Sequence, residues 1–288
     1  MQLLSLQSEV VDLLINILCA LGIMTLGIAH GAIDNILYGA ERGRSRLFFI
    51  AKYLMIVGLF ALLWFVFPNL AFLIFMAVSA YHFGQSQFVE YDFKPELLSK
   101  VLFALWGSLV LLFMLHFNGE ELLAIEDEYI HFAMMITHLV NYSAQYLTGV
   151  ATLFVLVFSL IIYFNKLRFN SFFKETYLLA LLALSFYMFP PFIAFALFFV
   201  WIHSLKVMLQ EFKYCKEELQ IKTIGEFIRL FLPLTIYSLL GTSVILLLVF
   251  HFGEIELIPQ VLLILLSCVT IPHSFVMDRF YGFVSAPE

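Results

Sequence analysis

Apolar runs long enough to cross a lipid bilayer recur from one end of the chain to the other, and short polar segments separate them. A membrane-spanning helix needs about 20 mainly apolar residues. Nine runs approach that length, at 11–30, 47–67, 70–89, 101–117, 146–164, 176–189, 191–206, 230–252 and 259–277. The pattern predicts an all-α fold, a polytopic transmembrane helix bundle with eight or nine spans.

Two connections in this pattern are informative. Pro190-Pro191 separates the sixth and seventh runs, and because proline cannot continue a helix, we expect a tight helical hairpin there. The segment 118–145, which includes Tyr129, Phe132 and Met134, is expected to form an outer interfacial helix or lid. No repeat or linker divides the chain, so residues 1–288 are expected to form a single bundle domain.

Composition supports a membrane protein and excludes other classes. Apolar residues make up 63% of the chain and charged residues 12%, against about 45–50% and about 25% in soluble domains. A net charge of −6 with only 15 Lys and Arg leaves no basic surface for phosphates, so no nucleic-acid partner is expected. The first run lacks a charged leader, so it is expected to stay in the mature protein. The three cysteines lie far apart, which excludes a disulfide framework and a thiolate metal motif.

The positive charges predict an orientation. All 15 Lys and Arg fall on one side of the nine-span arrangement, in or beside the odd-numbered loops and after the last span. Short cytoplasmic loops carry an excess of these residues. We therefore expect the N-terminus outside and the C-terminus in the cytoplasm. The protein is expected to be a multi-pass protein of the plasma membrane, or of the inner membrane in a cell that has two membranes.

Eight histidines divide into two groups by their expected depth. Four lie at outer ends or in the outer segment and are expected to be solvated or interfacial: His116, His131, His138 and His251. The others lie roughly 13 to 20 residues into spans that run inward, so at about 1.5 Å per residue they could share one layer in the inner half of the bilayer. This second group comprises His30, His82, His203 and His273.

Ionisable side chains inside a bilayer are costly and are by default functional candidates. Neutral imidazoles suit iron, zinc, copper or nickel, and structural zinc usually recruits thiolates that are missing here. The four inner histidines therefore predict a metal site, with iron favoured. The alternative for each is an interhelical hydrogen bond that only holds two spans together.

Other polar residues flank these histidines. Asp34 follows His30 by four residues, which puts both on one helix face. This spacing suits a carboxylate that accepts the second ring N–H of a metal-bound histidine, although a helix-end carboxylate beside Arg42 is the alternative. Tyr81 and Gln85 are further candidates for contacts around the ligands, or for local hydrogen bonds only.

Four short elements of the sequence resemble a known family, the Brp/Blh group of membrane-bound β-carotene 15,15'-dioxygenases that make retinal. They are His30-Gly31-Ala32-Ile33-Asp34, Tyr81-His82-Phe83-Gly84, His203-Ser204 with Glu211, and Pro272-His273. The resemblance implies a non-haem iron enzyme, with Fe(2+) held by histidines of the first three elements. It would cleave a β-carotene-like carotenoid at its central double bond with O₂. Membrane lipid and the carotenoid would be its partners, with a retinal-binding rhodopsin as a candidate partner.

The chain departs from the family pattern in the third element. Lys206 stands where the family has arginine, and Val207 where it has a second histidine. Valine has no ligand atom, so we expect His273 to complete the site. A site with three protein ligands, or a divergent protein with altered substrate or none, are the alternatives.

Two rival functions also stay open. One is a non-enzymatic carotenoid- or retinal-binding membrane protein. The other is a transporter that uses the histidines and Asp34 as a proton relay, although the chain lacks the repeated halves typical of such transporters.

Overall fold

The computed structural model describes residues 2–39, 46–91, 93–124, 133–165, 170–252 and 257–284. Helices make up nearly all of these residues, and no strand occurs among them, so the all-α prediction is confirmed. The elements are α1 Gln2–Gly22, η1 Ile23–Gly27, α2 Ile28–Ala32, α3 Asp34–Gly39, α4 Arg46–Val66, α5 Pro68–Phe88, α6 Glu96–Phe117, α7 Gly119–Ala124, α8 Ala133–Asn141, α9 Ser143–Asn165, α10 Asn170–Met188, α11 Pro191–Ala196, η2 Leu197–Ser204, α12 Leu205–Glu218, α13 Ile224–Phe252 and α14 Ile258–Val284.

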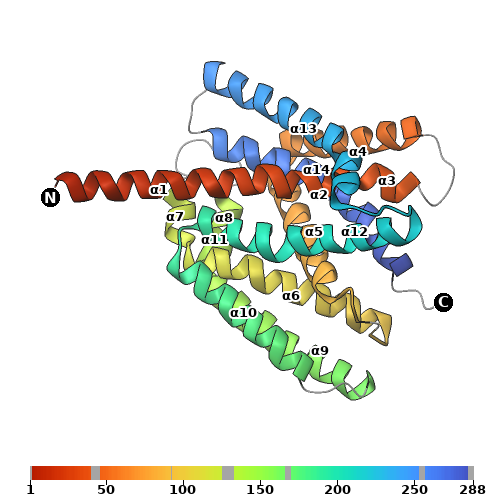
Figure 1. The fold of residues 1–288 in the computed structure, drawn as a ribbon. Helices are drawn as coiled ribbons and strands as arrows, with labels where there is room; N and C mark the ends of the chain where they lie inside the picture. The colour runs from red at the N-terminus through yellow and green to blue at the C-terminus, as the bar shows by residue number, and fades with distance from the viewer. Residues whose placement is uncertain are drawn as a thin grey trace.

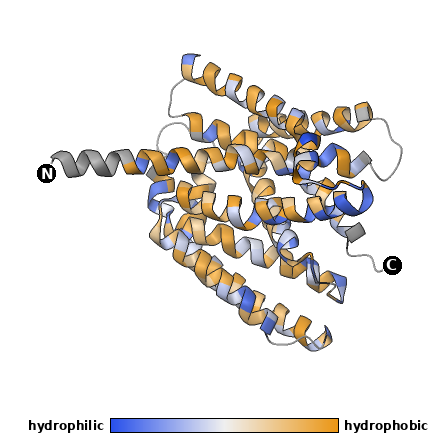
Figure 2. Cartoon of the chain, in the orientation of Figure 1, coloured by the Kyte–Doolittle hydropathy of each residue, from blue (hydrophilic) through white to orange (hydrophobic). Residues whose placement is uncertain are grey.

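The described part of the chain contains seven stretches that are long and apolar enough to span a membrane. The other two predicted runs are also helices, α5 and α10. Each is more polar, because α5 ends in a polar stretch around Gln85 and α10 has Lys174 and Glu175 in its second turn. Large apolar side chains lie on the outside, such as Phe65 at 86% exposure, and Figure 2 shows hydrophobic residues along most of each long helix. The chain is a multi-pass membrane protein, and its nine spans and orientation stay predictions.

Figure 1 shows the long helices side by side, with the start of α1 and the end of α14 at opposite ends of the bundle. Helix α5 lies inside, where it packs against α4, α6 and α14. Its contact with α6 is very close, because Cβ atoms added at Gly84 or Gly107 would overlap backbone of the facing helix. Glycine is needed at such close approaches, and this packing fixes α5 in the middle of the bundle.

The predicted break at Pro190-Pro191 is confirmed. Helix α10 ends at Met188 and α11 begins at Pro191, and Figure 1 shows the chain reversing direction there. The described residues of the segment 118–145 include two short helices, α7 and α8, and its role as an outer interfacial helix or lid stays a prediction. Tyr129, His131 and Phe132 lie outside the described residues, as do Arg42 and Arg44.

Candidate metal centre

The four inner histidines come together from four separate parts of the chain. They are buried, with exposures of 1% to 5%, and belong to α2, α5, η2 and α14. Their ring centroids are 5.4 Å apart for His30 and His203, and 4.9 Å apart for His203 and His82, His82 and His273, and His273 and His30. The planes meet at 78° to 89°. These contacts close a ring of four imidazoles in the order His30, His203, His82, His273.

Three of these histidines meet the geometric requirement for a shared ion. One ligand atom from each of His30, His82 and His203 lies within 4.8 Å of the other two. His273 completes the ring of imidazoles but is not part of this closest set. The described residues therefore contain a cluster of three buried histidines with the spacing that a metal ion requires, and a fourth beside it.

Two short π-helical segments set the direction of two of these side chains. Segment η1 ends three residues before His30, and segment η2 contains His203 in its last turn. A π-helical turn holds one extra residue, so it rotates the following residues by about 100° around the helix axis. Such turns are frequent at functional sites, and here they occur on two of the helices that carry the site.

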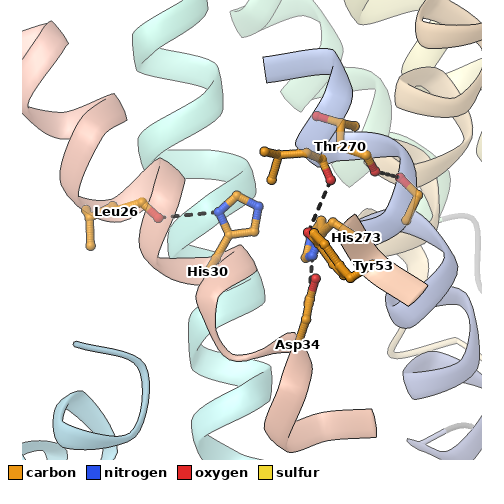
Figure 3. A network of polar contacts seen from close by, with 8 residues as sticks. Leu26, His30, Asp34, Tyr53, Thr270 and His273 are labelled. Carbon is orange, nitrogen blue, oxygen red and sulfur yellow. Dashed lines mark hydrogen bonds and ion pairs between the residues drawn. The ribbon is translucent and has the colours of Figure 1, made fainter. Parts of the chain in front are cut away.

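The hydrogen bonds of the rings leave several ring nitrogens without a hydrogen-bond partner among the described residues. His30 Nδ1 lies 3.3 Å from the Leu26 carbonyl oxygen, and His273 Nδ1 lies 2.9 Å from Asp34 Oδ1 (Figure 3). Both partners only accept, so each Nδ1 carries the proton and the lone pair is on Nε2. His273 Nε2, His203 Nε2 and both ring nitrogens of His82 have no hydrogen-bond partner among the described residues.

Buried polar atoms without partners are costly, and each one needs an explanation. A metal ion would bind one nitrogen of each of these rings, because neutral imidazoles bind iron, zinc, copper and nickel. The residues present therefore fit a transition metal. Separate interhelical hydrogen bonds do not account for His82, which makes none in the described structure.

Asp34 has a different partner from the one that its spacing predicts. Helix α2 ends at Ala32 and α3 begins at Asp34, so a turn at Ile33 separates His30 from Asp34. The Asp34 carboxylate accepts the His273 Nδ1–H instead, and both side chains are buried. The carboxylate still orients a histidine of the site, but that histidine comes from α14.

Tyr81 and Gln85 both contact Asp278 on α14, which sequence reasoning did not select. The Tyr81 hydroxyl donates to Asp278 Oδ1 over 3.2 Å, and Gln85 Nε2 donates to the same atom over 2.9 Å. These bonds join α5 to α14, the two helices that carry His82 and His273. Tyr53 of α4, which lies beside His273 (Figure 3), was missed as well. Its hydroxyl donates to the Val269 carbonyl oxygen over 3.3 Å, one turn before His273.

The cluster of four histidines has different surroundings on different sides. Phe83 and Phe199 contact His203, with ring centroids at 4.8 and 5.6 Å, and Phe199 also lies 5.8 Å from His30. Val207, at the position of the missing histidine, is fully buried in an apolar cluster with Ala29 and Ile33. One side of the site is therefore aromatic, and the Asp34 carboxylate lies on another.

Together, a multi-pass helical bundle and a cluster of buried histidines define a membrane protein with a buried site that could hold a metal ion. The chain belongs to the β-carotene 15,15'-dioxygenase family, because the sequence profile of that family matches residues 21–281. It is 24% identical over 275 residues to a β-carotene 15,15'-dioxygenase of an uncultured marine bacterium, 66A03, which covers 91% of this chain and 93% of the relative. No solved structure matches. The resemblance found in the four sequence elements is thus confirmed.

Proposed function

We propose that this protein cleaves a β-carotene-like carotenoid at its central double bond with O₂, giving retinal, and that it uses iron held by His30, His82, His203 and His273. Family membership supports the reaction class. The observation that carries the metal site is the convergence of buried imidazoles with ring nitrogens that have no hydrogen-bond partner in the part of the chain that the structure describes. Iron bound there as Fe(2+) would supply the activation of O₂.

The residues around the ring have distinct roles in this proposal. Asp34 holds His273 with Nδ1 protonated, so Nε2 is presented to the metal, as carboxylates commonly do for metal-bound histidines. Tyr81 and Gln85 bind Asp278 and hold α5 in register with α14. No side chain has to act as a general base, because the reaction splits a carbon–carbon double bond and requires no proton abstraction.

The aromatic side of the site suits the substrate. A carotenoid is a long apolar polyene dissolved in the bilayer, and Phe83 and Phe199 offer it apolar contact beside the histidines. They also exclude water from the reacting atoms. The protein would take its substrate from membrane lipid and release retinal there, where a retinal-binding rhodopsin is a candidate acceptor. We place it in the plasma membrane, which is the inner membrane in a cell that has two membranes.

His273 is proposed as the ligand that replaces the histidine missing at position 207. Val207 is packed among apolar side chains and offers no donor atom. His273 has a free Nε2 and a carboxylate partner, and its ring centre is 4.9 Å from those of His30 and His82. His273 therefore offers the donor atom that Val207 lacks, from α14 instead of α12.

The proposal is tested by expressing the chain in cells that make β-carotene, and by measuring retinal and iron in the purified protein. We expect retinal together with about one iron per chain. Loss of β-carotene without retinal would indicate another cleavage position. Bound carotenoid with neither product nor metal would favour the non-enzymatic binding protein.

A further inference from the structure

Ser86 is a buried residue of α5 that contacts the histidine cluster and belongs to none of the four sequence elements. It is 2% exposed. Its hydroxyl oxygen lies 3.1 Å from Nδ1 of His203 and 2.9 Å from the carbonyl oxygen of Phe83, three residues earlier in the helix. A single hydroxyl group therefore links one candidate ligand to the backbone of the helix that carries another.

These two contacts determine where the ring proton of His203 lies. A serine hydroxyl has one proton to donate, and a carbonyl oxygen can only accept. With the hydroxyl proton on the Phe83 carbonyl, the serine oxygen can only accept from His203, so Nδ1 of that ring carries the proton. The lone pair is then on Nε2, which has no hydrogen-bond partner among the described residues.

The residue next to Ser86 fixes this part of α5 against the helix of His203. Lys206 Nζ donates to the carbonyl oxygen of Gln87 over 2.6 Å and to its Oε1 over 3.2 Å. Gln87 Nε2 donates to Glu175 Oε2 over 2.8 Å. Glu175 is 1% exposed and Lys206 is half-buried, and buried charges persist only where partners satisfy them. Lys206 follows His203 by three residues, and Gln87 follows Ser86 directly. The network therefore holds the two residues of the Ser86–His203 contact next to each other.

We propose that Ser86 is a positioning residue that holds His203 in the tautomer whose Nε2 faces the metal, and that Lys206, Gln87 and Glu175 maintain its distance from the ring. The part of this inference that concerns metal binding rests on the proposed function. The tautomer itself does not, because the hydrogen bonds that select it form without metal.

The tautomer can be measured in metal-free protein. Solid-state NMR of protein with ¹⁵N-labelled histidine in lipid bilayers distinguishes protonated from unprotonated ring nitrogens, and loss of a signal in His203→Ala assigns that ring. We expect His203 with Nδ1 protonated in the unmodified chain. In Ser86→Ala a population with the proton on Nε2 should appear, and Ser86→Thr, which keeps the hydroxyl, should restore the original state. If Ser86→Ala leaves the Nδ1-protonated form alone in the spectrum, the proposal is overturned.

Metal binding gives a second readout. Co(II) titrated into the metal-free protein and followed by its absorbance should bind about 10-fold more weakly to Ser86→Ala, the lower end of the usual effect of removing a partner of a metal-bound histidine. Ser79→Ala is the matched control, because Ser79 is on the same helix, is 1% exposed, and its hydroxyl has no partner among the described residues. Equal affinities of the two variants would contradict the proposal. If the unmodified chain binds no Co(II), the metal site fails, and the NMR experiment still decides the role of Ser86.

Discussion

The inner and outer histidines of this protein lie in opposite environments. The inner four are buried and contact one another, and His82 has no hydrogen-bond partner in the described structure. The outer ones that the structure describes are exposed and have separate local contacts. His116 is 3.1 Å from the Ser143 hydroxyl, His138 is 3.0 Å from the Tyr146 hydroxyl, and His251 packs against Phe252.

The difference shows what makes a histidine a metal-ligand candidate in a membrane protein. An exposed imidazole satisfies its nitrogens with water or a neighbouring hydroxyl, so it needs no further partner. A buried imidazole with a free nitrogen needs another ligand for that nitrogen. Convergence of several such rings, rather than their number in the sequence, identifies the site.

The largest contrast between the two groups is expected for His82 and His138. His82→Ala removes the ring whose two nitrogens have no hydrogen-bond partner among the described residues, and we expect at least a 100-fold loss of metal affinity and no detectable retinal. His138→Ala should leave both unchanged. Metal analysis of the purified proteins and retinal extraction from expressing cells check this. Retained iron in His82→Ala would remove the distinction between the groups.

His273→Ala tests whether the fourth inner ring acts as a ligand. We expect a loss of bound iron comparable to that of His82→Ala, because the ring offers a free Nε2 to the cluster. Val207→His in the same background adds an imidazole one helical turn from His203 and should restore part of the iron. If His273→Ala binds iron and forms retinal as well as the unmodified chain, the site uses three protein ligands and His273 is structural.

Asp34→Asn should have an intermediate effect. The amide keeps an acceptor near His273 but loses the charge that stabilises the ring N–H, so we expect about a 10-fold decrease in metal affinity. Competition with a chelator of known affinity measures the change. Gln260→Ala is the control, because Gln260 is on α14, the helix of His273, but lies 13 residues before that histidine. A change equal to that of the control would show that Asp34 does not act through the metal site.

The smallest effects are expected in the outer group. His116→Ala removes one contact with Ser143 at an exposed position, so its effect on stability should stay within about 0.5 kcal/mol. Iron content and retinal yield should not change. Thermal unfolding in detergent and metal analysis test this, and a loss of iron would mean that depth does not separate the two groups.

Much of the fold follows from the apolar pattern. The runs predicted the long helices, and Pro190-Pro191 predicted the break between α10 and α11, because proline excludes a continuous helix. The histidine layer was predicted from depth along each span, which needs only the rise per residue. These features depend on local sequence, so one chain was enough to find them.

The hydrogen-bond partners of the histidines were harder to predict from the sequence. Asp34 binds His273, 239 residues away, because the turn at Ile33 interrupts the helix that would have aligned it with His30. The π-helical segment η2 is apolar almost throughout, so no periodic pattern marks it. Ser86 reaches His203 only because α5 packs against η2. Such contacts depend on which helices meet, and spacing within one helix does not determine that.

The most direct test of the proposed metal site is the iron stoichiometry of purified protein, measured together with retinal formation in the unmodified chain, His82→Ala and His138→Ala. We expect about one iron per chain and retinal formation for the unmodified protein and His138→Ala, and neither for His82→Ala. Retinal formation by protein without metal, or full iron content in His82→Ala, would show that the buried histidines do not hold the metal on which carotenoid cleavage depends.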